Sequence, residues 1–160
     1  MTQRNSEIVR VGVISDTHGL LRPEATAELG GSDFLIHAGD VGDPEILEEL
    51  SRIAPLTTVR GNVDRGSWAK RLPKTQMFAL NKTFIYVLHD LSDLDLSPRA
   101  AGIAAVVSGH SHVAVQSTKD GVLYFNPGSA GPRRFKLPVT IGKITIIDGK
   151  VQSEIVELKI

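Results

Sequence analysis

Short apolar runs rich in valine and isoleucine recur along the chain, and they predict a protein built largely on β-strands. The runs are IVRVGVIS (8–15), DFLIHAG (33–39), LTTVRG (56–61), TFIYVLH (83–89), IAAVVSG (103–109) and GVLYFN (121–126). Their short length and their β-branched side chains favour strands over helices.

Two segments between the early runs carry the signals of a helix start. Asp43 is a suitable N-cap residue. The proline that follows it suits the first turn of a helix, and the glutamate after that places an acid near the positive end of the helix dipole. Pro23 opens a shorter helix that ends at the glycine pair 30–31. Alternation of strand, helix and strand predicts right-handed crossovers and a sheet covered by helices.

The later part of the chain predicts antiparallel pairs instead. Residues 140–160 alternate apolar and polar positions on both sides of Asp148-Gly149, which is a favoured hairpin turn. Residues 76–89 suggest a second hairpin around Asn81-Lys82. We therefore expect an α/β fold with two packed, mixed sheets and helices outside them.

Composition narrows the class of protein. The length of 160 residues suits a single domain, 1–160, with a real core. Lysine plus arginine and aspartate plus glutamate number 18 each, so the net charge is zero. This balance argues against a protein whose main task is to bind nucleic acid or an anionic membrane, although a local basic patch is compatible with it.

The chain contains no cysteine, which excludes disulfides and thiolate metal sites, so any metal here must be bound through nitrogen and oxygen. The first residues, MTQRNSEIVRV, have no apolar signal core, and no window approaches 18 uninterrupted apolar residues. We expect a cytoplasmic protein without a membrane partner.

Each of the six apolar runs ends in residues that can bind a metal or a phosphate. They are Asp16, Thr17 and His18; Asp40; Asn62 and Asp64; His89 and Asp90; His110 and His112; and Asn126, Gly128 and Ser129. Parallel strands bring their carboxyl ends to one edge of a sheet, where sites form in open α/β folds. Four of the five histidines fall in this set, which scattered structural histidines would have no reason to do.

The number of candidate ligands points to two ions. Seven side chains qualify: Asp16, His18, Asp40, Asn62, His89, His110 and His112. One ion cannot use seven, whereas two ions that share a carboxylate can. The mixture of nitrogen and oxygen suits Mn, Fe, Zn or Ni better than Ca or Mg. A two-metal centre clamps an in-line displacement and makes hydroxide from water near neutral pH, which is the chemistry of phosphoester hydrolysis.

The motifs DTH, HAGD, GNVD, His89, GHSH and NPGS stand in the order found in the calcineurin-like metallophosphoesterases. The sequence resembles the small, cap-less branch of bacterial and archaeal phosphodiesterases, which also contains the retromer scaffold subunit. The resemblance covers nearly the whole chain, from about Val9 to the last hairpin. It implies a four-layer α/β/β/α sandwich with the metals at the carboxyl ends of the strands.

The resemblance also implies a role for each candidate. One ion would be held by Asp16, His18 and His112, the other by Asn62, His89 and His110, and Asp40 would bridge them. Asp40, Asn62 and His89 would act in catalysis through the metals, with a bridging water as nucleophile and no covalent intermediate. The implied cofactors are two divalent transition-metal ions, manganese first, with nickel, zinc or iron as alternatives. The implied substrate is a small phosphoester, a diester rather than a monoester.

Residues around the site leave alternatives open. His37 lies inside its strand and is interpreted as a packed or supporting residue rather than a ligand. Asp64 either orients a neighbour or caps the next segment. Asn126, Ser129 and Arg133 are candidate substrate contacts, against the plainer readings of a Pro-Gly turn and of a solvated arginine pair, Arg133 and Arg134.

The chain departs from the family in two places. Many relatives carry a histidine directly after the GN motif, where it can protonate the leaving group, and this chain has Val63. Many relatives also read His-Gly-His where this chain reads His89-Asp90-Leu91. The small phosphodiesterase branch often lacks the first histidine too, so Val63 is not expected to abolish activity, whereas the second departure puts substrate contacts and turnover in question.

Two other classes of function compete with an enzyme. A non-catalytic, metal-binding interaction module of the same fold would be favoured by lost ligands, and all seven are present. A nuclease of a DNA-repair complex would need further domains and a basic groove, so no stable nucleic-acid complex is expected. The sequence leaves a homo-oligomer open.

Overall fold

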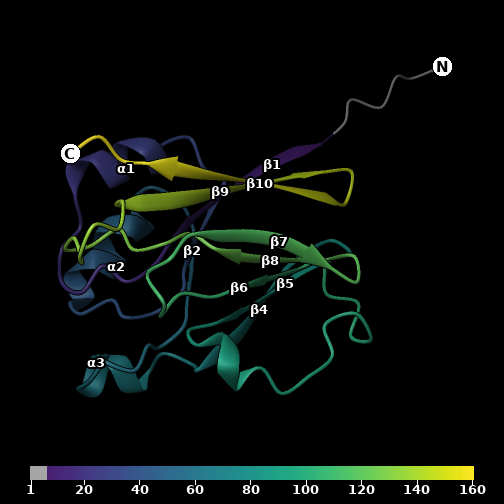
Figure 1. Ribbon diagram of the computed structural model, residues 1–160, viewed down its shortest axis with the longest axis horizontal. Coiled ribbons are helices and arrows are strands. Elements are labelled where there is room, and N and C mark those ends of the chain that lie inside the picture. Colours follow the sequence, from purple (N-terminus) through teal and green to yellow (C-terminus); the bar gives the residue numbers. More distant parts are fainter. Residues whose placement is uncertain (1–6) are drawn as a thin grey trace.

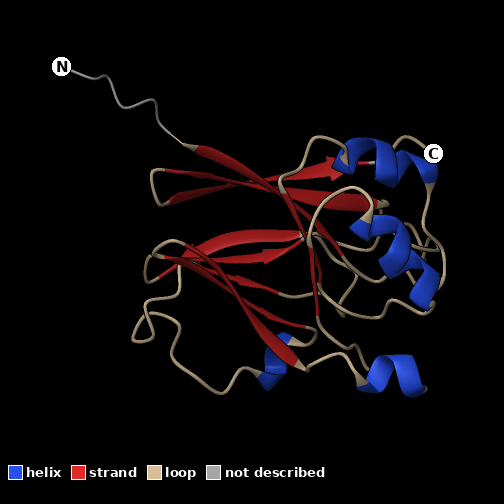
Figure 2. Cartoon of the chain, turned by 180° about the vertical axis from the view of Figure 1, so that it is seen from behind, coloured by secondary structure: helices blue, strands red, loops and turns tan. Residues whose placement is uncertain are grey.

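The computed structural model describes residues 7–160 and folds them into two packed β-sheets (Figures 1 and 2). The first sheet has the order β10-β9-β1-β2-β3 and the second the order β4-β5-β6-β8-β7. The strands are β1 (Ile8–Ile14), β2 (Phe34–His37), β3 (Leu56–Thr58), β4 (Thr75–Leu80), β5 (Thr83–Leu88), β6 (Ala105–Val107), β7 (Val115–Lys119), β8 (Val122–Asn126), β9 (Thr140–Ile147) and β10 (Lys150–Glu157). Both sheets are mixed, which confirms the predicted fold class.

Helices cover the outer face of the first sheet. The helical elements are α1 (Pro23–Leu29), α2 (Pro44–Ser51), α3 (Ser67–Lys70) and one 3-10 turn, η1 (Leu91–Asp93). Leu29 of α1 and Leu50 of α2 are fully buried in a cluster with Leu35 of β2. The Asp43 carboxylate accepts a hydrogen bond from the Glu45 backbone N–H at 2.9 Å, as the predicted N-cap requires.

The outer face of the second sheet is covered differently. Leu94 and Leu96 pack there against Tyr86 and Val106. Where the resemblance implied a helical layer, residues 90–104 form a loop whose one regular element is η1. The Asp90 side chain accepts from the Ser92 N–H at 2.9 Å, a local bond of the kind that favours turns over helices.

The core lies between the two sheets, where valines and isoleucines of β1 and β2 face those of β5 and β6 together with Phe125. The two predicted hairpins are confirmed, with turns at Asn81-Lys82 and Asp148-Gly149. A third hairpin, β7–β8, was not predicted. Strand β7 is VQSTK, all five residues are exposed, and the segment therefore shows no apolar alternation.

The parallel strands place the candidate site. Strands β1, β2 and β3 run parallel in the first sheet, and β5, β6 and β8 run parallel in the second. Their carboxyl ends lie at the end of the sandwich where Figure 1 shows the helices, opposite the turn of the β9–β10 hairpin. Five of these six strands are followed by the candidate metal ligands, and β8 is followed by the candidate substrate residues.

Within residues 7–160, no helix has the length and apolar character needed to span a membrane. The prediction that no signal core opens the chain rests partly on residues 1–6, which lie outside the described residues.

Candidate metal centre

Most of the candidate ligands sit on tight turns with an unusual backbone conformation. Among residues 7–160, nine residues other than glycine have positive φ, and five of these nine are candidate ligands. These five are Asp16 (φ 55°), His18 (φ 45°), Asp40 (φ 56°), His110 (φ 70°) and His112 (φ 63°). Left-handed conformations cost energy for such residues and tend to cluster at functional sites. The fold therefore holds these side chains in place at an energetic cost.

Two glycines allow the turns to approach one another. A Cβ atom at Gly61 would overlap the backbone nitrogen and the carboxylate of Asp40, and one at Gly109 would overlap the Ser15 hydroxyl. Because glycine has no side chain, the loops after β3 and β6 can lie directly on those after β2 and β1.

The first group of ligand atoms comes from the loops that follow β1 and β6. The Asp16 Oδ1 atom lies 3.3 Å from His112 Nε2 and 3.7 Å from His18 Nε2. The two Nε2 atoms are 3.2 Å apart. Asp16 is fully buried.

The second group comes from the segments that follow β2, β3, β5 and β6. The Asp40 Oδ2 atom lies 3.1 Å from His89 Nε2, which is 2.9 Å from Asn62 Oδ1. Asn62 Oδ1 lies in turn 3.1 Å from His110 Nδ1.

Asp40 stands between the two groups. Its Oδ2 atom is 3.1 Å from His89 Nε2 on one side and 3.7 Å from His18 Nε2 on the other. Its Oδ1 atom accepts a hydrogen bond from the Val63 backbone N–H at 3.0 Å. This is the position that a carboxylate shared by two ions must occupy.

The donor atoms fit two divalent ions. With metal–ligand bonds of about 2.1 Å, ligand atoms around one ion lie about 3.0–3.4 Å apart, close to the distances within each group. Asp16 Oδ1 is buried and has no hydrogen-bond partner among the described residues, so it has free lone pairs where the histidines converge. Within residues 7–160, Asp16, His18 and His112 form one set suited to a metal ion, and Asp40, His89 and His110 form another.

Hydrogen bonds behind the ligands fix which atoms they present. His89 Nδ1 lies 2.8 Å from the Ala38 carbonyl oxygen and donates to it, so Nε2 is the free nitrogen that faces Asp40. Asp16 Oδ2 accepts from the Ser15 hydroxyl at 2.7 Å and from the His110 N–H at 3.1 Å, which leaves Oδ1 for the histidines.

Asp40 and His89 stabilise each other's charged form. Burial is the largest single influence on the pKa of each and opposes the charged form, but the hydrogen bond between them, the backbone bonds with Val63 and Ala38, and the attraction of nearby opposite charges together outweigh it. The result is a pKa of Asp40 below its ordinary value and a pKa of His89 above it. Both shifts indicate a carboxylate whose surroundings favour a neighbouring positive charge.

His37 is a packed, supporting residue rather than a ligand. It is fully buried, and its Nδ1 atom accepts from the Gly39 N–H at 3.1 Å, so the hydrogen of its neutral ring is on Nε2, 3.0 Å from the Thr17 hydroxyl. Burial is the main cause that lowers its pKa from 6.5 to about 4.

We expect His37 to make the metal-free protein sensitive to acid. The unfolded chain takes up this proton below pH 6.5 and the folded chain only near pH 4, so stability is full above pH 6.5 and falls as the pH drops toward 4. Between pH 7 and 5 the loss should be about 2 kcal/mol, at about 1.4 kcal/mol per pH unit. Urea unfolding in the presence of a chelator measures it. His37→Asn, which keeps an acceptor for Gly39, should show a smaller loss over the same range, and an equal loss would contradict the assignment to His37.

The side chains of two candidate substrate residues, Asn126 and Ser129, form hydrogen bonds within the protein. Asn126 donates to the Gly109 carbonyl at 2.9 Å and to the Ser111 hydroxyl at 3.1 Å, and the Ser129 hydroxyl donates to the Asp16 carbonyl at 3.0 Å. These bonds favour a role in positioning the ligand loops. Their predicted contact with substrate stays a prediction, as does that of Arg133.

The contacts of Asp64 favour the first of its two predicted roles, that of orienting neighbouring residues. It is buried, and its carboxylate accepts from the Gly42 N–H at 3.0 Å and from the Gly61 N–H at 2.8 Å. It therefore ties the loop after β3 to the loop after β2, rather than capping a surface segment.

A cleft of about 580 Å³ opens beside the second group of ligands. Its polar lining includes Arg60, Asn62, Asp64, Lys74, His89, Asp90, Asp93 and Asp95. The sequence offered no signal for Arg60, Lys74, Asp93 and Asp95, because they belong to different segments that only the fold brings together. Hydrogen bonds from Ser92 lower the pKa of Asp90 below its ordinary value.

Comparison with known families and proteins agrees with this geometry. The calcineurin-like phosphoesterase superfamily domain matches residues 9–149. A probable metallophosphoesterase of Methanocaldococcus jannaschii is 32% identical over 162 residues, which cover 93% of this chain and 81% of that protein.

Solved structures share the fold at lower identity. Vacuolar protein sorting 29 from Cryptosporidium parvum superposes with a TM-score of 0.75 at 18% identity, covering 96% of this chain and 99% of the other. An archaeal phosphodiesterase superposes with a TM-score of 0.73 at 21% identity, covering 92% and 100%. These two likenesses concern the fold.

Proposed function

The chain belongs to the calcineurin-like phosphoesterase superfamily, and we propose that it is a dimetal-dependent phosphodiesterase. The observation that carries the proposal is Asp40, whose Oδ2 atom is in contact with a histidine of each ligand group. A site for one ion would not need a carboxylate in that place.

In this proposal Asp16, His18 and His112 hold one ion, Asn62, His89 and His110 hold the other, and Asp40 is shared. When bound, such ions lower the pKa of water and stabilise the charge that develops on the phosphoryl oxygens. The chain itself orients the ligands, through the bond from His89 to Ala38 and through those from Ser15 and the His110 N–H to Asp16. No serine or cysteine nucleophile is assigned.

The finer points of the proposal follow from the donor set. Nitrogen and oxygen ligands suit manganese, nickel, zinc or iron, and the resemblance to the family puts manganese first among them. The cleft beside the second group would take one arm of a small phosphodiester. We also propose that residues 1–160 form one domain that acts in the cytoplasm.

The test is hydrolysis by protein first stripped of metal and then supplied with Mn, Ni or Zn. Bis(4-nitrophenyl) phosphate should be hydrolysed only after metal is added, at two equivalents per chain, and faster than 4-nitrophenyl phosphate. Chelation should return the rate to that of the stripped protein. Two bound equivalents without any turnover of diesters would contradict an enzyme and would support an interaction module of the same fold.

A further inference from the structure

We propose that the segment Arg133-Arg134-Phe135-Lys136, the RRFK turn, binds the nucleoside part of a phosphodiester substrate. The substrates would therefore be small nucleotide diesters. This inference rests on the proposed function, since it names the class of substrate for the same site.

Phe135 has two features that do not stabilise the folded chain, an exposed aromatic side chain and a left-handed backbone conformation. Its side chain is 93% exposed, more than any other large apolar side chain among the described residues. Its φ of 54° lies in the left-handed region, at the first central position of a turn closed by a bond of 3.1 Å from the Leu137 N–H to the Arg134 carbonyl. Glycine is favoured at such a position, and a bulky residue there is a strained outlier. An aromatic ring held out in this way is available to a ligand.

The residues around Phe135 add positive charge. Arg133, Arg134 and Lys136 are exposed, and over residues 7–160 no carboxylate lies within 4 Å of their side-chain nitrogens. The chain as a whole has no net charge, so this concentration of three cations in four residues is local. It suits an anionic ligand.

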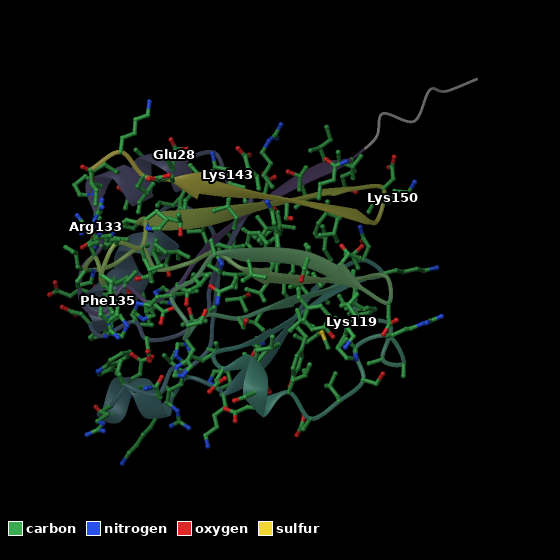
Figure 3. The ribbon with its side chains drawn as sticks, in the orientation of Figure 1. Glu28, Lys119, Arg133, Phe135, Lys143 and Lys150 are labelled. Atoms are coloured by element: carbon green, nitrogen blue, oxygen red, sulfur yellow. The ribbon has the colours of Figure 1, made fainter. Side chains whose placement is uncertain are left out.

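The RRFK turn belongs to a loop that is hydrogen-bonded to segments next to the candidate metal centre. It belongs to the loop between β8 and β9, and Figure 3 shows Arg133 and Phe135 at the same edge of the molecule. Earlier in this loop, the Ala130 N–H donates to the Ser15 carbonyl at 3.1 Å, and Gly131 accepts from the Arg22 guanidinium at 3.3 Å. His112, Ser129, Arg133 and Arg134 lie around one narrow crevice that has no room for a water molecule, so they are close neighbours. The turn therefore lies next to a candidate metal ligand.

A nucleotide diester matches this arrangement in both of its parts. Its base presents a flat π-face that can stack on Phe135, and its phosphate oxygens can accept hydrogen bonds from the guanidinium groups. A membrane surface fits less well, because one phenylalanine whose neighbours in the turn are all cationic offers little apolar area for insertion. A small nucleotide substrate agrees with the expectation that no stable nucleic-acid complex forms.

The experiment compares two diesters that share one leaving group. Thymidine 5′-(4-nitrophenyl phosphate) carries a nucleoside on its other arm, and methyl 4-nitrophenyl phosphate carries a methyl group. The readout is the ratio of the two kcat/KM values for the metal-loaded enzyme, in which any loss of folded protein cancels. We expect the nucleoside diester to be preferred by about tenfold or more, as base stacking on an aromatic side chain implies.

Variants of Phe135 then test the ring itself. Phe135→Ala and Phe135→Leu should bring the ratio close to one, whereas Phe135→Trp should keep it. Ile8→Ala removes another exposed apolar side chain, on β1, and should leave the ratio as in the parent. A parent ratio near one, or a ratio that Phe135→Leu does not change, would overturn the inference while the proposed function stands. Failure to hydrolyse either diester would instead count against the proposed function. Binding to phosphatidylglycerol vesicles that Phe135→Ala abolishes, with an unchanged ratio, would assign the turn to a membrane and also overturn the inference.

Discussion

Replacing Asp40 with asparagine is expected to remove both metal ions and to lower kcat/KM for a phosphodiester by about 10³-fold or more. The carboxylate touches His18 of one ligand group and His89 of the other, so its charge serves both ions. Two-metal sites supply several kcal/mol of charge stabilisation, and about 4 kcal/mol corresponds to a factor of about 10³. The amide oxygen of asparagine can still accept the bond from the Val63 N–H, so the local fold should survive.

The measurement is metal content by elemental analysis together with the rate at saturating manganese. Asp120→Asn is a matched control, because Asp120 also has a left-handed φ, of 53°, but lies in the β7–β8 turn away from the ligands. It should keep two equivalents of metal. His112→Gln should weaken mainly one ion, since His112 belongs to the first group. Two firmly bound equivalents in Asp40→Asn would contradict the shared carboxylate.

Much of the fold could be predicted because its signals are local. The apolar runs became strands, Asp43 caps its helix, and the Asp-Gly pair at 148–149 makes its hairpin turn. Strand β7 could not be predicted, because an edge strand with five exposed residues needs no apolar pattern and is held by pairing with β8. The loop over the second sheet was also missed, since the resemblance supplied a helical layer that the local bond from Ser92 to Asp90 opposes.

The meeting of the candidate ligands at one site was predictable for a different reason. Each follows an apolar strand, and parallel pairing then brings the strand ends together whatever the loops do. The walls of the site were not predictable in this way. Arg60 and Lys74 meet Asp93 in one cleft because of how the sheets and loops pack, and no spacing along the chain encodes that meeting. The exposure of Phe135 is likewise a property of the folded chain, because a lone phenylalanine in a sequence is more often buried.

Because Val63 stands where many relatives have a histidine, we expect the hydrolysis rate to depend steeply on the pKa of the leaving group. The Val63 side chain is 42% exposed beside Asn62 and has no proton to give. The carboxyl group of Asp90 cannot take over, because an ordinary aspartate is already ionised at neutral pH and hydrogen bonds from Ser92 lower the pKa of Asp90 further. A general acid contributes typically about 10²–10⁴ in rate, and most where the leaving group is basic. Diesters with poor leaving groups should therefore be hydrolysed far more slowly than diesters with good ones.

A series of substituted aryl phosphodiesters measures this dependence in the parent and in Val63→His. The variant should flatten it, with a gain of about 10²-fold for the poorest leaving groups and little for the best, since only the former need a proton. Val63→Thr, of similar size and without a titratable group, should keep the steep dependence of the parent. Metal content must be equal in all three proteins, because an added histidine can also bind an ion. A shallow dependence in the parent would contradict the assignment of position 63 as the vacant acid site. It would point to Lys74, which lines the cleft beside Asn62 and His89, and Lys74→Met would then make the dependence steeper.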